Sequence, residues 1–206
     1  CGDVPGDPYK PMNHYDLAEA AARKIIESGA MIISLGADHG VPIPVFRALS
    51  SLPDLSDPIT LVHVDAHLDW RDHVNGVHEG LSSPIRRASE MDHFGEIYQI
   101  GLRSAGSARP DEMEAARKYG ANLIPDIELQ EVGMKAVLDR IPNGGTYYLT
   151  IDADGIDPTI APAIAGPAPG GVTYPHMRTL IPGLVENGRV AGMDIVQITP
   201  KRDVNA

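Results

Sequence analysis

Residues 61–69 carry the side chains with the clearest chemical potential, because an apolar run of strand character ends there in three possible metal ligands. Asp65, His67 and Asp69 stand at alternating positions, so in an extended or tightly turning backbone they point to the same side. We expect them to converge on one point, where a carboxylate could bridge two metal ions. The alternative for this segment alone is an acidic turn that caps a helix and leaves His67 solvated.

Other imidazole and acidic side chains follow or end similar apolar runs. They are His39 after residues 30–35, Asp152 and Asp154 after residues 146–151, and Asp194 in residues 189–195. Open parallel sheets bind ligands beyond the carboxyl ends of their strands, so we predict that these residues share one edge and one site. Solvated acids placed at random would instead scatter over helix faces and both edges of the sheet.

The elements that must position these residues alternate along the chain. Apolar runs predict strands at residues 30–35, 59–64, 96–102, 121–124, 146–151 and 189–195. Helical patterns cover residues 16–29 with Asp16 as N-cap and Glu19 at N3, then 45–52, 84–91, 110–119, 134–141 and 174–187. This order predicts an α/β fold, a three-layer α/β/α sandwich with a mainly parallel, doubly wound sheet. A barrel is the alternative.

Composition limits the class of partner. A length of 206 residues with 43% hydrophobic content predicts one domain with a sizeable core. The net charge of -11 argues against nucleic acid and anionic membranes as partners, and it favours a cationic substrate. Cys1 is the single cysteine, which excludes an intramolecular disulfide framework, and no run has the apolar length of a transmembrane helix or secretory signal. We therefore expect a cytoplasmic protein.

The candidate ligands comprise two imidazoles and four carboxylates without a thiolate, a hard set that suits Mn²⁺ and could accept iron, cobalt or nickel. Four carboxylates cannot share a small space unless cations neutralise their charge, and two divalent ions would do so. Two-metal sites hold their ions roughly 3.5 to 4 Å apart around a shared water, whose pKa falls toward neutrality. The predicted reaction is therefore hydrolysis by a metal-generated hydroxide.

Four segments resemble the signatures of the ureohydrolase family, whose best-known members are arginases and agmatinases. They are residues 36–40, residues 65–69, residues 152–158 with 169–171, and residues 194–200. The resemblance covers nearly the whole chain, in order and at appropriate spacing. The chain is most similar to agmatinase-like members of the family. The resemblance implies the arginase-like form of the sandwich.

The resemblance implies a binuclear manganese centre with six protein ligands. Asp65 and Asp152 would bridge both ions, His39 and Asp69 would complete one ion, and His67 and Asp154 the other. The bridging hydroxide would attack a guanidinium carbon and release urea and an amine. Family members are generally trimers or hexamers and are longer at both ends, so residues 1–206 are expected to form a single catalytic domain that lacks terminal parts of the family fold.

One departure from the family concerns the substrate. Gln197 stands where the family usually has a glutamate that pairs with the substrate guanidinium, and a neutral amide cannot form that charge-assisted pair. Asp194 is the nearest acid that could compensate, which makes Gln197 and Asp194 the candidate substrate-binding residues and Asp194 a catalytic candidate. Residues 162–167 also lack the hydroxyls usual in the family loop. We therefore expect an atypical guanidino or amidino substrate.

Four further residues have competing interpretations. His78 lies near the position of the family's proton-shuttling histidine, with His73 as a rival and a solvated loop histidine as the alternative. His63, inside an apolar strand, is predicted to be a hydrogen-bonded core histidine. Arg103 is expected to support packing or an oligomer interface rather than chemistry.

The leading functional hypothesis is a manganese-dependent, homo-oligomeric amidinohydrolase that acts on a small cationic guanidino compound. The first alternative is a non-catalytic partner or metal-binding subunit of a hetero-oligomer. The second is a metal-dependent hydrolase of another C–N bond, as in the structurally related deacetylases. The number of bound metal ions and the release of urea distinguish the three.

Overall fold

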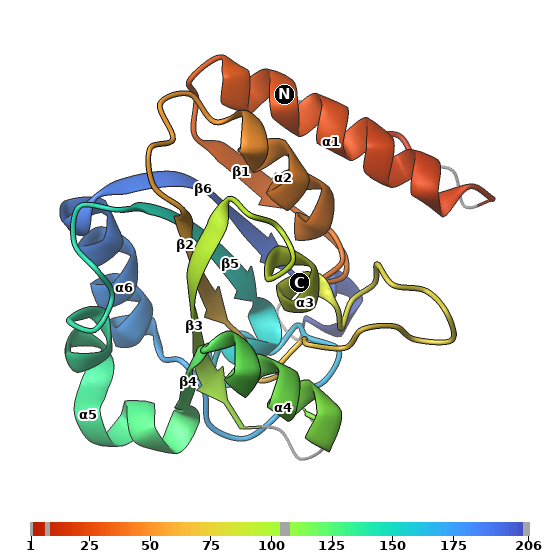
Figure 1. Cartoon of the computed structure of the whole chain (residues 1–206). Helices are drawn as coiled ribbons and strands as arrows, with labels where there is room; N and C mark the ends of the chain where they lie inside the picture. The colour runs from red at the N-terminus through yellow and green to blue at the C-terminus, as the bar shows by residue number, and fades with distance from the viewer. Residues whose placement is uncertain (1, 7–8, 104–107, 204–206) are drawn as a thin grey trace.

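The structure, a computed structural model, describes residues 2–6, 9–103 and 108–203, and of residues 11–13 it describes the backbone alone. Cys1 lies outside the described residues. The architecture is a three-layer α/β/α sandwich, which confirms the fold class expected from the alternation of strands and helices (Figure 1).

The central layer is one parallel sheet with the strand order β1-β6-β5-β2-β3-β4. Its strands are β1 (Ile32–Leu35), β2 (Ile59–Val64), β3 (Phe94–Leu102), β4 (Asn122–Pro125), β5 (Thr146–Asp152) and β6 (Arg189–Val196). From β2 the chain builds the sheet outward to β4, and from β5 it builds in the opposite direction to β6. The order of the strands therefore reverses between the neighbours β2 and β5, and ligand sites of open sheets lie at such a reversal.

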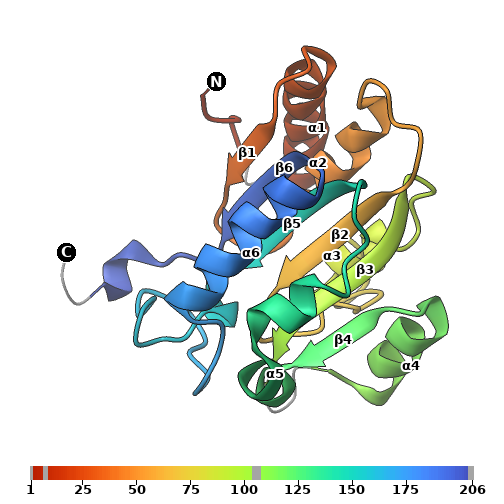
Figure 2. The ribbon, with the colours of Figure 1, turned by 90° about the vertical axis from the view of Figure 1, so that its left-hand side faces the viewer.

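Helices cover both faces of the sheet. On one face lie α1 (Pro11–Glu27), α2 (Pro42–Ala48), α3 (Pro84–Ala88) and α4 (Pro110–Tyr119), and on the other α5 (Asp126–Leu138) and α6 (Tyr174–Asn187). Figure 2 shows α5 and α6 in front of the sheet and α1, α2 and α3 behind it. Three 3₁₀ turns, Leu49–Ser51, Ala153–Gly155 and Pro200–Arg202, complete the described elements.

The sheet separates two hydrophobic cores. Leu61 on β2 packs on the side of α1 to α4, whereas Val62 and Val64 pack on the side of α5 and α6. All six residues of β2 are buried, because this strand lies inside the sheet and is covered on both faces. Burial of each such side chain is worth about 1.5–3 kcal/mol, so the strand that carries the ligand turn is firmly held.

Three helix starts differ from the expectation, and the simplest case is α2, which begins at Pro42 instead of Val45. The first helix begins at Pro11, and Asp16 therefore lies inside the helix instead of capping it. Proline suits the first helical position because its φ is fixed near the helical value and no amide hydrogen needs a partner there. The fifth helix begins at Asp126 because it consists of two helical segments, which meet at a kink at Gly133, where φ is 76°. The periodicity of the sequence indicated only the part beyond that break.

The edge strand β1 is covered on one face only. Ile32 packs against α1 and α2, whereas Ile33 and Leu35 on the opposite face are exposed. The expectation of helices over both faces therefore holds for the inner strands but not for β1 within the described residues.

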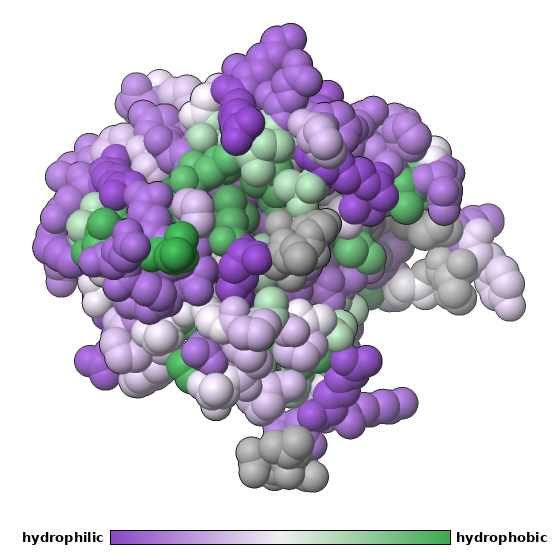
Figure 3. Space-filling model, turned by 90° about the horizontal axis from the view of Figure 1, so that it is seen from below, coloured by the Kyte–Doolittle hydropathy of each residue, from purple (hydrophilic) through white to green (hydrophobic). Residues whose placement is uncertain are grey.

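The surface agrees with the charged composition. Hydrophilic side chains cover most of the face seen from below, with apolar side chains exposed in a few patches (Figure 3). No helix in the described part of the chain combines the length and apolarity needed to cross a membrane.

Candidate metal centre

The candidate ligands lie at the carboxyl ends of neighbouring strands. The turn with Asp65, His67 and Asp69 follows β2, while Asp152 ends β5 and Asp154 stands in the 3₁₀ turn that follows it. His39 enters from the loop after β1. This is the place where the strand order reverses between β2 and β5, as expected for a ligand site of an open sheet.

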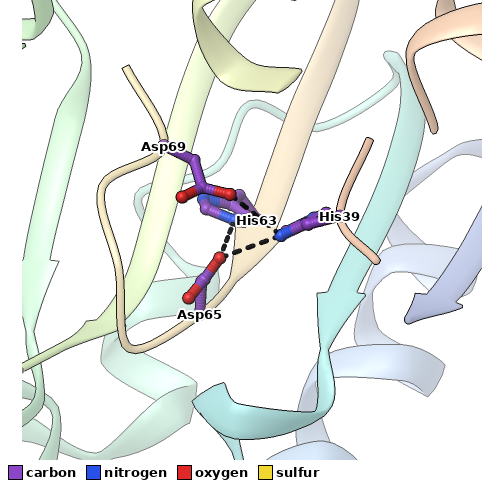
Figure 4. A group of neighbouring side chains, drawn as sticks. All are labelled: His39, His63, Asp65 and Asp69. Carbon is purple, nitrogen blue, oxygen red and sulfur yellow. Dashed lines mark hydrogen bonds and ion pairs between the residues drawn. The ribbon is translucent and has the colours of Figure 1, made fainter. Parts of the chain in front are cut away.

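The first group of ligand atoms surrounds the imidazole of His39. Its Nδ1 lies 3.0 Å from Asp65 Oδ2, 3.1 Å from Asp69 Oδ2 and 3.2 Å from Asp152 Oδ2 (Figure 4 draws His39 with Asp65 and Asp69). All four side chains are buried. Ligand atoms about 2.1 Å from an octahedral divalent ion are about 3.0 Å apart, so these spacings fit one such ion.

The second group surrounds the imidazole of His67. Its Nδ1 lies 3.3 Å from Asp65 Oδ1 and 3.3 Å from Asp154 Oδ2. Asp65 thus offers Oδ2 to the first group and Oδ1 to the second, which is the geometry of a carboxylate between two cations. Asp152 places Oδ2 in the first group, and its Oδ1 accepts a hydrogen bond from the amide of Asp154 at 2.8 Å.

The same local turn produces both clusters. Asp65 Oδ1 accepts from the amide of His67 at 2.6 Å, just as Asp152 accepts from the amide of Asp154. An aspartate that bonds the amide two residues later closes a tight turn and brings the second side chain back beside the first. Gly155 lets the two turns approach, because a Cβ on it would lie 2.6 Å from the Cα of Asp65.

A buried hydrogen-bond chain holds Asp65 from the side of β3. The indole of Trp70 donates to Gln99 Oε1 at 2.6 Å, so the amide nitrogen of Gln99 faces Leu68 O at 2.8 Å and His63 Nδ1 at 2.9 Å. His63 Nδ1 therefore accepts, and Nε2 carries the proton that is donated to Asp65 Oδ2 at 2.8 Å. Both ring nitrogens are used, so His63 is a hydrogen-bonded core histidine, as predicted, although it lies among the ligands (Figure 4).

A second buried chain holds His39. The hydroxyl of Thr150 donates to Asp194 Oδ1 at 2.8 Å and lies 2.9 Å from His39 Nε2, so Nε2 donates to that hydroxyl. His39 Nδ1 is buried and makes no hydrogen bond with correct geometry to any described residue, and neither does Asp154 Oδ1. Buried polar atoms normally have such partners, so these two atoms fit ligands aimed at cations.

Asp194 lies behind His39 and away from the cavity. It is fully buried on β6, beside Thr150 of β5, and it does not line the cavity described below. Burial raises the pKa of Asp194 to about 6, although the charge of His39 opposes that rise. Its carboxylate accepts from Thr150, which in turn accepts from His39, so Asp194 supports His39 from behind, and its expected role toward a substrate stays a prediction.

The pKa values record the crowding of negative charge. Burial and the charge of Asp65 raise the pKa of Asp152 to about 8, and the same causes raise the pKa of Asp69. Contacts with Asp154 and Asp65 raise the pKa of His67 to about 11. For His39, burial favours the neutral ring, but three carboxylates outweigh it and raise the pKa well above the ordinary value. Divalent cations would relieve this repulsion, so the donor set fits two hard metal ions.

A cavity of about 260 Å³ opens over the second group. The candidate ligands His67, Asp69, Asp152 and Asp154 line it, together with Arg71, Leu81, Ser82, Glu112 and Gln197. The side chain of His67 is 35% exposed, so the second group is the more open of the two, although Asp69 and Asp152 of the buried first group also line the cavity. Gln197, expected from its position in the last signature, is therefore placed where it can meet a ligand.

The expectation for His78 is not supported by its position. Its side chain is 54% exposed, its Nδ1 lies 3.6 Å from Asp72, and it does not line the cavity. Leu81 and Ser82 of the same loop line the cavity instead. The histidines His73 and His78 lie side by side, with ring centroids 5.4 Å apart.

Two cavity residues were not anticipated from the sequence. Arg71 Nε donates to Glu112 Oε1 at 2.9 Å across 41 positions of the chain. Glu112 is at the start of α4, where an acidic residue is explained by helix capping alone, so the sequence held no signal for its place here. Arg71 follows the ligand Asp69 by two positions, and that alternation was the available signal.

Arg103 holds the turn after β5, as expected for a packing residue. Its guanidinium donates to the carbonyl oxygens of Asp154 at 2.7 Å and Gly155 at 3.1 Å. A Cβ on Gly171 would lie 2.8 Å from this guanidinium, so only glycine leaves room for it. Arg103 therefore fixes the backbone that presents Asp154.

Comparison with known proteins places this site in a family context. A guanidinopropionase from Pseudomonas aeruginosa is 33% identical over 98% of this chain, which spans 64% of that protein. An agmatinase from Bacillus anthracis is 31% identical over 98% of the chain, which spans 67% of that protein. The structure of a proclavaminate amidino hydrolase from Streptomyces clavuligerus superposes with a TM-score of 0.86 at 25% identity, over 98% of this chain and 67% of that chain.

The chain thus spans about two-thirds of the lengths of these proteins. The model of the arginase family matches residues 1–206, the whole sequence. The fold, the clustered histidines and aspartates and the similarity to these proteins agree, and the chain belongs to the arginase family.

Proposed function

We propose that this chain is the catalytic part of a binuclear-metal amidinohydrolase that cleaves a small guanidino compound to urea and an amine. The observation that carries the proposal is the division of Asp65 between two ligand groups, with Oδ2 beside His39 and Oδ1 beside His67. Two relatives, a guanidinopropionase and an agmatinase, support the choice of reaction.

The spacing of the ligand atoms supports a role for each residue toward the metal ions. His39 and Asp69 would hold the inner ion, His67 and Asp154 the outer ion, and Asp65 both, with Asp152 beside the inner ion and, as the family resemblance implies, a second bridging ligand. Bound divalent ions supply Lewis acidity, which lowers the pKa of water and makes it a nucleophile at neutral pH. Because the ligands are oxygen-rich and lack thiolate, we propose Mn²⁺ as the resident ion, with nickel as a substitute.

The cavity assigns roles toward the substrate. A guanidino group over the outer ligands would lie beside Gln197, which lines the cavity. The backbone N–H of Gln197 is fixed by a 2.8 Å hydrogen bond to Ala37 O. The side-chain amide of Gln197 both donates and accepts hydrogen bonds, so it can orient a guanidino nitrogen without adding a negative charge. We therefore propose Gln197 as a substrate-binding residue.

We also propose that the protein is a cytoplasmic homo-oligomer, a trimer or hexamer. The support is the resemblance to ureohydrolases, and for the compartment the single cysteine among 206 residues. Light scattering coupled to size-exclusion chromatography measures the oligomer, and a monomeric mass at micromolar concentration would contradict it.

The test combines metal analysis with a substrate screen. The purified chain is loaded with Mn²⁺, its metal content is measured by mass spectrometry, and urea is assayed with arginine, agmatine, 4-guanidinobutyrate, guanidine and a biguanide. We expect two ions per chain and urea from at least one compound. Two ions without urea would favour the non-catalytic partner, and full activity with one ion would contradict the binuclear mechanism.

A further inference from the structure

An ion pair stands in the cavity wall beside the candidate metal ligands. Arg71 Nε donates to Glu112 Oε1 at 2.9 Å, and both residues line the cavity with Asp154 and Gln197. The side chain of Glu112 is only 4% exposed, while that of Arg71 is 24% exposed. Glu112 is therefore enclosed, and Arg71 is the partner that a ligand can reach.

Both carboxylate oxygens of Glu112 are already used within the protein. Oε1 accepts from Arg71, and Oε2 accepts from the backbone amide of Arg109 at 3.0 Å, which satisfies an amide at the start of α4. A cationic ligand would have to compete with both hydrogen bonds. The evident role of Glu112 is to hold Arg71 in one orientation against a rigid helix.

Arg71 is held by two hydrogen bonds, which leave its terminal amino groups available to a ligand. Its backbone amide donates to Ser82 O at 3.0 Å, and its Nε is bound to Glu112. Its two terminal amino groups make no hydrogen bond or ion pair with any residue in the described part of the chain. A guanidinium anchored through Nε presents these groups as a planar fork, the geometry that binds a carboxylate through two parallel hydrogen bonds.

The turn after β2 links this fork to the metal ligands. Asp69 adopts a positive φ of 55°, Trp70 is buried in the core, and both Asp69 and Arg71 line the cavity. Alternation along the chain thus puts the ligand and the guanidinium on the cavity side and the indole on the core side. The separation between the metal ligand Asp69 and the guanidinium of Arg71 is therefore set by the three consecutive residues from Asp69 to Arg71.

The summed charge of the cavity residues and the metal ions indicates which charge a substrate should carry. Four carboxylates, two divalent ions and one hydroxide would leave a single negative charge, which one guanidinium balances, while Arg71 and Glu112 neutralise each other and Gln197 is neutral. Agmatine carries two positive charges and would find no uncommitted carboxylate among these residues. A guanidino acid is a zwitterion whose carboxylate can bind the fork while its guanidinium lies over the metal ligands.

We propose that Arg71 is a carboxylate-binding residue and that the substrates are ω-guanidino carboxylic acids, an inference that rests on the proposed function. The net charge of -11 favours cations at long range, but the fork of Arg71 selects at contact distance. The substrate class therefore differs from the simple cation that the composition suggests.

The first test compares substrates on the Mn²⁺-loaded wild-type chain. 4-Guanidinobutyrate and agmatine share a four-carbon chain but end in a carboxylate and an ammonium, and n-butylguanidine ends in neither charge. We expect kcat/KM for the acid to exceed that for agmatine about tenfold or more. Guanidinoacetate and 3-guanidinopropionate then measure the distance between the metal site and the fork. A preference for agmatine would overturn the proposal.

The second test removes the fork. Arg71→Gln should lower kcat/KM for 4-guanidinobutyrate about 10- to 100-fold and leave that for n-butylguanidine within about twofold, since a charge-assisted pair is lost. Arg71→Lys should restore part of the loss, and Arg86→Gln, a change at a half-buried residue of α3 that does not line the cavity, should have no effect. Equal losses on both compounds would show a structural role and contradict the assignment.

A third measurement separates this inference from the proposed function. If no guanidino compound releases urea, the proposed function is wrong, and calorimetry can then measure binding of unreacted 4-guanidinobutyrate and n-butylguanidine directly. Tighter binding of the acid, lost in Arg71→Gln with unchanged metal content, would still support the carboxylate site. Equal binding of the two compounds would refute it.

Discussion

The two halves of the metal centre differ in how they are enclosed. The inner half, around His39, is buried, and two hydrogen-bond chains hold it through Thr150 and His63. The outer half, around His67, faces the cavity and lies beside the proposed substrate groups Gln197 and Arg71. The inner half is therefore built to retain an ion, and the outer half to present one to a ligand.

Removal of the shared ligand should have the largest effect, because both halves depend on it. Asp65→Ala deletes Oδ1 and Oδ2 together, so we expect the metal content to fall from two ions toward none and turnover to drop by about four orders of magnitude or more. Mass spectrometry of metal content and a urea assay check this. Retention of one ion at wild-type affinity would mean that the halves do not share Asp65.

Removal of an outer ligand should separate the halves. His67→Ala should lose the outer ion selectively, leaving about one ion per chain, and should reduce turnover by about three orders of magnitude. Asp154→Asn should behave in the same way because it acts on the same ion. Loss of both ions from either variant would contradict the independence of the inner half.

Disruption of the chain behind Asp65 should affect the inner half without touching a ligand. Gln99→Leu leaves Trp70 Nε1 and His63 Nδ1 without partners, which should lower the free energy of unfolding by about 1–3 kcal/mol. The affinity for the inner ion should fall about 10- to 100-fold, as for other residues that orient metal ligands. Denaturant unfolding and metal titration measure the two effects. Gln130→Leu is the matched control at an exposed residue, which loses only hydrogen bonds to Asp126 and Gly171 O, with an expected change under about 1 kcal/mol and no change in metal affinity.

A charge added to the outer half should change selectivity and leave metal binding intact. Gln197→Glu offers the guanidinium a charge-assisted partner, worth roughly 1.5–3 kcal/mol, so kcat/KM for agmatine should rise about 10- to 100-fold. Steady-state kinetics with agmatine and arginine check this. Efficient hydrolysis of agmatine by the wild type, unimproved by the glutamate, would return the protein to an ordinary agmatinase.

The smallest effect should come from the loop histidine outside both halves. A proton shuttle at His78 predicts a hundredfold loss for His78→Ala, but its exposed position away from the cavity predicts a change in kcat of less than about twofold. The pH–rate profile of the variant decides between them. A lost limb of that profile would restore His78 to the mechanism and imply that the loop moves.

The parts of the fold that local signals specify were predictable. The fourth and sixth helices, Pro110–Tyr119 and Tyr174–Asn187, have their predicted bounds because a proline or capping threonine starts each and a glycine follows each. The alternation of Asp65, His67 and Asp69 after a buried strand brought all three to one site, as expected, through the tightly turning backbone that Asp65 closes. Local geometry determines such features, so the sequence displays them.

Tertiary structure decided what local periodicity leaves open. Alternation allows two directions for each side chain, and packing turned Asp194 into the core behind His39 and away from the cavity. Residues distant in sequence completed the site: Glu112, from another element, orients Arg71, and Gln99 fixes the proton of His63. Such pairings depend on which strands and helices meet across the sheet, which no single segment specifies. The sequence by itself therefore determined which residues can bind the metals, and only the assembled sheet decided which groups orient them and which face the substrate.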